Sequence, residues 1–80
     1  MSISKLHVMG LPISFGDPDV WTYFGEFGAV VSVKLIRDLK GTSTGFAVVQ
    51  MDAELDDGLI GTLNRVRIEG SSLVVWRPPH

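Results

Sequence analysis

The sequence contains no cysteine, which excludes disulfide bonds and thiolate metal sites. Cysteine usage therefore gives no indication of whether the protein works in an oxidising or a reducing compartment. It also has no run of the roughly 20 apolar residues that a membrane-spanning helix needs. Met1 to Pro12 lack the basic start and the long apolar stretch of a signal peptide. We therefore expect a soluble, intracellular protein, and nothing in the sequence separates nucleus from cytoplasm.

The composition describes one small domain. Of the 80 residues 45% are apolar, and the mean hydropathy is +0.26. A single modest core is the most that such a chain can build, with a free energy of unfolding near the low end of about 5 to 15 kcal/mol. We expect one domain over residues 1–77, and at 78–80 the start of a C-terminal linker or tail. The formal net charge of −2 argues mildly against a polyanionic partner.

The first half of the chain changes its hydrophobic period twice. Residues 5–9 alternate polar and apolar, which predicts a strand buried on one face. Residues 17–27 carry apolar side chains at helical spacing, with Asp17 as N-cap and Pro18 at the first helical position. Residues 29–37 are rich in Val and Ile and predict a second strand.

The second half repeats this order. Small and hydroxyl residues at 38–44 predict a flexible hairpin connection, and a third strand follows at 45–51. We expect Asp52 to cap a second helix whose apolar residues are Leu55, Leu59, Ile60 and Leu63. A turn-rich connection at 64–71 leads to a last strand at 72–77. The order βαββαβ predicts an α+β, ferredoxin-like fold, with a four-stranded antiparallel sheet and two helices on one face.

One face of the predicted sheet stays open, because two helices cover only the other. Alternation sends these residues to the core: Leu6, Val8, Val33, Leu35, Ala47, Val49, Met51, Leu73 and Val75. Val31 shares the parity of Val33 and Leu35. The outward residues are His7, Met9, Lys34, Ile36, Thr44, Phe46, Val48, Gln50, Val74 and Trp76. This set is more apolar than a solvated sheet face, so we expect it to bind a partner.

Four blocks of the sequence carry a recognisable pattern: residues 6–11, 23–38 and 44–51, and Leu63-Asn64 together with 68–75. In their order and spacing they resemble an RNA-recognition motif, and the resemblance covers essentially the whole chain. Residues 6–11 look like the family's hexamer, and residues 44–51 are similar to its octamer, K/R-G-F/Y-G/A-F-V-x-F/Y. Residues 23–38 resemble its first helix and second strand. Leu63-Asn64 and residues 68–75 resemble its passage from the second helix to the last strand.

The resemblance implies binding of single-stranded RNA, whose bases stack on aromatic side chains of the two central strands. Phe46 keeps one stacking position, His7 replaces the hexamer's aromatic, and Trp76 offers a further ring. Val48 replaces the second aromatic of the octamer, and Thr44 its basic first residue. Because stacking contributes about 1 to 3 kcal/mol per base, we expect weak to moderate, sequence-tolerant binding. The full predicted set is Phe46, His7, Trp76, Met9, Val48, Thr44, Lys34, Ile36, Arg37, Lys40 and Arg77.

Charges are segregated in the predicted fold. Seven of the nine acidic residues fall on or beside the helices: Asp17, Asp19, Glu26, Asp52, Glu54, Asp56 and Asp57. Basic residues lie on the sheet or its rim: Lys34, Arg37, Lys40 and Arg77. We expect these four to contact phosphates.

Two other classes of function compete with RNA binding as explanations of the sequence. Acylphosphatases share the topology but use an Arg in the first loop, and metal chaperones use cysteines there; residues 10–16 contain neither. No nucleophile has a plausible base, and His7 and His80 are the only histidines, so we expect no enzyme, metal or cofactor. A protein-interaction module, as a sheet-mediated homodimer or a partner contact, remains an open alternative because Met9, Ile36, Val48 and Val74 suit it equally.

Overall fold

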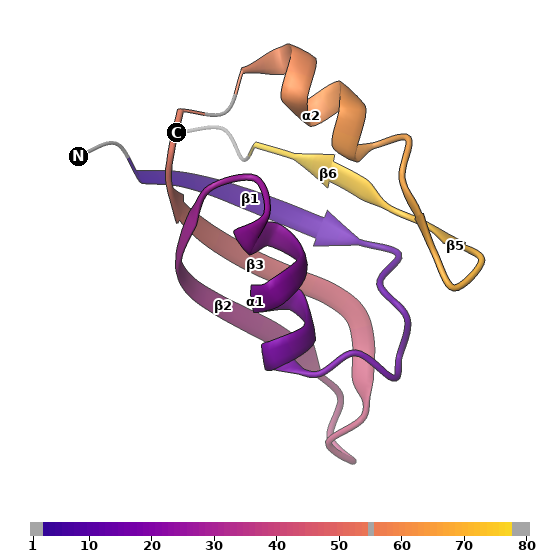
Figure 1. Cartoon of the computed structure of the whole chain (residues 1–80). Helices are drawn as coiled ribbons and strands as arrows, with labels where there is room; N and C mark the ends of the chain where they lie inside the picture. Colours follow the sequence, from indigo (N-terminus) through magenta and orange to yellow (C-terminus); the bar gives the residue numbers. More distant parts are fainter. Residues whose placement is uncertain (1–2, 55, 78–80) are drawn as a thin grey trace.

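The computed structural model describes residues 3–54 and 56–77 (Figure 1). The chain runs through β1 (Ile3–Met9), α1 (Asp17–Gly25), β2 (Ala29–Arg37), β3 (Ser43–Asp52), α2 (Asp57–Leu63), β4 (Arg67–Ile68), β5 (Ser71–Ser72) and β6 (Val74–Trp76). The main sheet has the strand order β2-β3-β1-β6, and all of its pairs are antiparallel. The predicted α+β, ferredoxin-like fold is confirmed.

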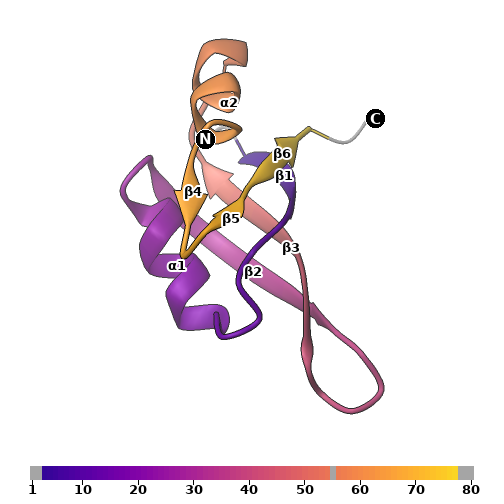
Figure 2. The same ribbon diagram turned by 90° about the vertical axis from the view of Figure 1, so that its right-hand side faces the viewer.

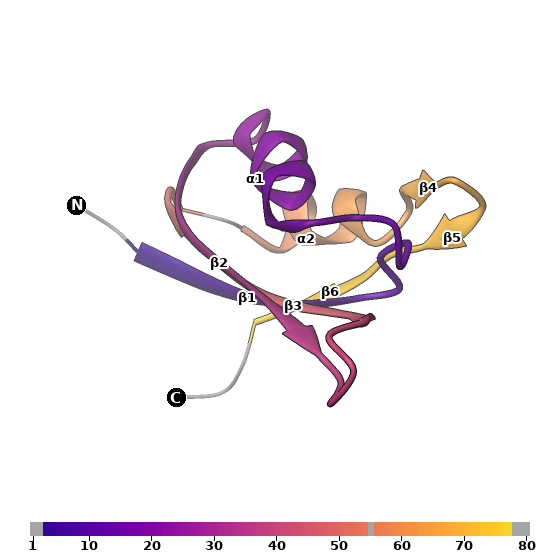
Figure 3. The same ribbon diagram turned by 90° about the horizontal axis from the view of Figure 1, so that it is seen from below.

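The two helices lie on the same side of this sheet and leave its other side bare (Figure 3). Between helices and sheet lies one core, to which α1 contributes Val20 and Phe24 and α2 contributes Leu63. The remaining buried apolar residues come from the strands and loops: Leu6, Val8, Leu11, Leu35, Ala47, Val49, Met51, Leu73 and Val75. The predicted alternation is confirmed in β1, β3 and β6.

A bulge in β2 corrects the expectation for Val31. Val30 pairs with Met51, but the next pair joins Ser32 to Gln50, so Val31 is the extra residue. Val31 is 47% exposed and does not share the buried side of Leu35, while Val30 packs against the core instead. An extra residue in one strand shifts the parity of the residues before it, which simple alternation cannot anticipate.

Both helices begin at other residues than predicted. The N-cap of α1 is Gly16, whose backbone N–H donates to the Asp19 carboxylate at 2.8 Å, so the prediction of Asp17 was wrong by one residue. The N-cap of α2 is Asp56, whose carboxylate accepts from the Leu59 N–H at 2.8 Å. Asp52 is therefore not the cap; it pairs with Ala29 and ends β3.

The connection from α2 to β6 is more ordered than its composition indicated. β4 and β5 form a small hairpin within residues 64–72, directly before the start of β6 (Figure 2). Just before it, the Asn64 side chain donates to the Val75 carbonyl at 2.9 Å and accepts from the Val75 N–H at 2.5 Å. This pair of bonds occupies the outer backbone edge of β6 and fixes the strand that carries Trp76. The predictions for Leu55 and for residues 78–80 lie outside the described residues.

Gly45 lies near the start of β3, directly before Phe46, and has no room for a side chain. Its φ is +80°, and an added Cβ would lie 2.8 Å from the Leu11 carbonyl oxygen. The Leu11 N–H donates to the Gly45 carbonyl at 3.1 Å. The glycine of the octamer-like segment thus lets the loop after β1 cross closely over the start of β3, next to Phe46.

Candidate nucleic-acid interface

Three rings from three strands meet on the open face. His7 lies in β1 between Phe46 of β3 and Trp76 of β6. The ring centroids are 5.6 Å apart for His7 and Phe46, 5.5 Å for His7 and Trp76, and 5.9 Å for Phe46 and Trp76. All three pairs meet edge to face, with interplanar angles of 62°, 81° and 65°. We call these three residues the ring cluster.

The sheet register places the rings together. His7 is directly opposite Trp76 on one side and Val48 on the other. Phe46 is two residues before Val48 on β3 and therefore faces the same side of the sheet. Edge-to-face contacts are the favoured arrangement of aromatic pairs, so each ring braces the other two. All three remain partly exposed, and a planar base can therefore reach them.

Apolar side chains extend the ring cluster toward one end of the sheet. Met9 and Val74 are paired across β1 and β6 and are 46% and 49% exposed. Val48 and Ile36 are half-buried on the β2 side. A surface of this kind is more apolar than a solvated sheet face and suits a partner that brings flat, weakly polar groups.

Three of the four predicted phosphate-binding cations lie on or beside this face. Lys34 is exposed and directly opposite Val48, so that β3 lies between it and His7 of β1. Arg37 and Lys40 lie at the hairpin between β2 and β3, where Arg37 Nη1 donates to the Gly41 carbonyl at 3.1 Å. Thr44 is exposed beside them and donates its hydroxyl to the Ile36 carbonyl at 2.9 Å.

The hairpin that carries these cations is closed by Asp38. Its carboxylate accepts from the backbone N–H groups of Lys40 at 2.9 Å and Thr42 at 3.0 Å. The connection predicted as flexible thus has a defined turn, and Leu39 at its tip is fully exposed. The turn holds Arg37 and Lys40 at the rim of the open face.

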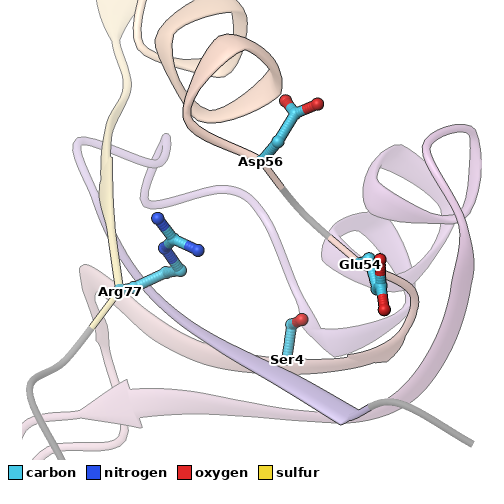
Figure 4. Close-up of a pocket in the computed structure, with 4 residues that line it drawn as sticks. All are labelled: Ser4, Glu54, Asp56 and Arg77. Atoms are coloured by element: carbon cyan, nitrogen blue, oxygen red, sulfur yellow. The ribbon is translucent and has the colours of Figure 1, made fainter.

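The structure does not bring Arg77 to the ring cluster. Its guanidinium forms an ion pair with Asp57 at the start of α2. Ser4, Glu54, Asp56 and Arg77 line a hollow of about 320 Å³ beside that helix (Figure 4). Two of these four side chains are carboxylates, which repel phosphate. A phosphate contact by Arg77 remains a prediction that would require the ion pair to open.

Sequence reasoning passed over one cation on the open face. Lys5 is exposed on β1, shares the outward parity of His7 and pairs with Gln50 of β3. The signal was present in the sequence, because residues two apart in a strand share a face. Ser32 of β2 pairs with Gln50 from the other side, and its hydroxyl donates to Gln50 Oε1 at 2.8 Å.

Metal and membrane features are missing from the part of the chain that the structure describes. No group of three or more His, Asp or Glu side chains there is placed to hold a metal ion. None of its helices is long and apolar enough to cross a membrane.

Comparison with known proteins decides the family. The model of the RNA recognition motif matches residues 6–57, which include the hexamer-like residues 6–11 and the octamer-like residues 44–51. The chain belongs to the RNA recognition motif family. This is a family of RNA-binding domains and not of enzymes, which confirms the function class that the sequence predicted.

Relatives and solved structures agree with this assignment. The human RNA binding protein fox-1 homolog 3 is 36% identical over 72 residues, 89% of this chain and 23% of that protein. The Sex-lethal RNA recognition domains 1 and 2 from Drosophila melanogaster superpose with a TM-score of 0.82 at 28% identity, over 96% of this chain and 50% of theirs. A Sex-lethal protein/RNA complex gives 0.82 at 33% identity, over 94% and 47%. The chain thus spans about a quarter or less of the curated relatives it matches.

Proposed function

We propose that this RNA recognition motif binds single-stranded RNA on its open sheet face, with Phe46, His7 and Trp76 stacking on bases. The observation that carries the proposal is the ring cluster, with its three centroids within 5.9 Å of one another. Met9, Val48 and Ile36 would contact sugars and base edges, and Lys34, Arg37 and Lys40 the phosphates. Thr44 lies at the rim of the same face, and Arg77 would contribute only after leaving Asp57.

Affinity should be weak to moderate. The octamer's second aromatic is Val48, so one base loses a stacking partner worth about 1 to 3 kcal/mol. Trp76 offsets part of this loss because it joins the cluster from β6. A module of this strength would act inside the cell beside other RNA-binding domains of a larger RNA-processing or RNA-regulatory protein. A relative in complex with RNA supports the ligand class.

An NMR titration with short oligo(U) and mixed RNA tests the proposal. We expect shifts at His7, Phe46 and Trp76 that disappear in a folded Phe46→Ala variant. If three or four phosphates are neutralised, log K should fall against log salt with a slope of about −2 to −3. A flat salt response, or no shifts at millimolar RNA, would contradict RNA binding.

The exposed pair Met9 and Val74 favours a second candidate, a protein contact through the same face. It predicts a dimer or a partner complex that survives high salt, because apolar burial is not screened. Sedimentation of the protein without RNA separates the two functions. A concentration-dependent dimer lost in Val74→Asp would support the protein contact.

A further inference from the structure

A row of polar side chains crosses the open face beside the ring cluster. It consists of Lys5 on β1, Gln50 on β3 and Ser32 on β2, and Gln50 pairs directly with both of the others. The neighbouring row on the same face contains His7 and Val48. Two residues along a strand span about 7 Å, so a base next to one stacked on the ring cluster can reach the polar row.

The regular part of the β2–β3 ladder places Ser32 in this row, and the β2 bulge lies directly beside it. Lys34 pairs with Val48 and Val33 with Val49, so the same register sets Ser32 opposite Gln50. The extra residue, Val31, lies between this pair and the pair of Val30 with Met51, where the register shifts by one residue. Bulges commonly re-aim side chains beside functional sites.

The hydrogen bond between Ser32 and Gln50 determines what the row offers to a ligand. Ser32 Oγ donates to Gln50 Oε1 at 2.8 Å in a partly buried position, so the acceptor of the carboxamide is engaged. Gln50 Nε2 keeps two N–H donors, and the Lys5 ammonium across β1 has three. The row therefore presents mainly donors.

We propose that the polar row selects keto bases, uracil or guanine, over the amino bases cytosine and adenine at one position beside the stacked base. Gln50 is the specificity-determining residue, and Ser32 is a positioning residue that fixes the Gln50 amide. A keto oxygen accepts from the Gln50 amide, whereas an exocyclic amino group brings a donor against donors. This inference rests on the proposed RNA binding and adds a modest preference to a largely sequence-tolerant surface.

The test measures affinity of the 80-residue chain for two matched pairs of pentanucleotides by fluorescence anisotropy. Oligo(U) and oligo(C) form the pyrimidine pair, and oligo(I) and oligo(A) the purine pair. One or two added hydrogen bonds predict keto binding about fivefold tighter in at least one pair. Preference in the pyrimidine pair identifies uracil, and preference in the purine pair identifies a guanine-like base.

Two variants separate the roles within the row. Gln50→Glu replaces donors by acceptors at nearly constant shape, so the keto preference should reverse. Ser32→Ala releases the amide, and the preference should shrink toward unity. Thr62→Ala is the matched control: it removes an exposed α2 hydroxyl, bonded to the Gly58 carbonyl at 3.0 Å, and should leave the ratio unchanged.

The outcomes distinguish this inference from the proposed function. Equal binding of both members in each pair, with binding still lost in Phe46→Ala, would overturn the selectivity and keep RNA binding. A preference for amino bases would overturn it in favour of an acceptor such as Asp52, the next outward residue of β3. Absence of any RNA binding would overturn both.

Discussion

Successive residues of β3 belong to two different surfaces. Ala47, Val49 and Met51 have 0% exposure beneath the helices, whereas Phe46 and Val48, which alternate with them, remain partly exposed on the open face. Both sets are apolar, so hydrophobicity alone does not tell them apart. The comparison shows that one parity of the strand stabilises the fold while the other keeps apolar surface available for a ligand.

The largest effect should come from the covered face. Phe24 of α1 is completely buried, and Phe24→Ala should lower the free energy of unfolding by about 3 to 5 kcal/mol because it leaves a cavity. Chemical denaturation followed by circular dichroism measures this. Trp21→Ala is the matched control, since Trp21 is 45% exposed on the same helix and should cost about 1 kcal/mol or less. Equal losses in the two variants would contradict the assignment of faces.

Phe46→Ala should give the opposite pattern. RNA affinity should fall by about 1 to 3 kcal/mol, roughly 5- to 150-fold, because a stacking ring is lost. The free energy of unfolding should change by only about 1 kcal/mol, since Phe46 contacts His7 and Trp76 at the surface rather than the core. Isothermal titration with oligo(U) and a denaturation curve measure the two quantities. Trp21→Ala again serves as control, and loss of RNA binding in it would place the site on the wrong face.

This separation of faces was largely predictable from the sequence. The period-2 pattern assigned β1, β3 and β6 because nothing interrupts their ladders between the residues concerned. The meeting of His7, Phe46 and Trp76 followed once the topology placed the last strand beside the first. Leu35 and Lys34 were also placed correctly, because the irregularities of β2 lie on either side of them.

What the sequence did not reveal depends on contacts between distant segments. The bulge at Val31 is fixed by the pairing of β2 with β3, which no local pattern encodes. The start of α2 moved from Asp52 to Asp56 because Asp52 stays in the ladder with Ala29. The ion pair of Arg77 with Asp57 joins residues 20 positions apart, and side-chain direction at a strand end cannot be read from parity.

The cations offer a third way to test the two faces, through a smaller effect. Lys34→Ala should make the slope of log K against log salt less negative by about 0.7, the contribution of one phosphate contact to a single strand. Arg77→Ala should leave the slope nearly unchanged, because that guanidinium pairs with Asp57. Anisotropy titrations at several salt concentrations give both slopes. If Arg77→Ala changed the slope as much as Lys34→Ala, the ion pair would have to open on RNA binding.

The smallest effect concerns Tyr23, which lies on the covered side of the sheet and should make the free energy of unfolding depend on pH. Its hydroxyl is buried without a hydrogen-bond partner among the described residues, and burial, with a smaller contribution from the Glu26 charge, raises its pKa above the ordinary value of 10.0. The folded protein keeps the phenolic proton at a pH where the unfolded chain has released it. The free energy of unfolding should therefore fall as the pH rises through about 10.

Tyr23→Phe removes both the buried hydroxyl and its titration. At neutral pH the variant should equal the wild type or exceed its free energy of unfolding by up to about 1 kcal/mol, because no buried polar group is left unpaired. Above about pH 10 the advantage should grow, since only the wild type loses stability through this group. Urea denaturation across this pH range measures the difference, and the RNA affinity at neutral pH should not change. A variant less stable than the wild type at every pH would mean that the hydroxyl has a partner in solution.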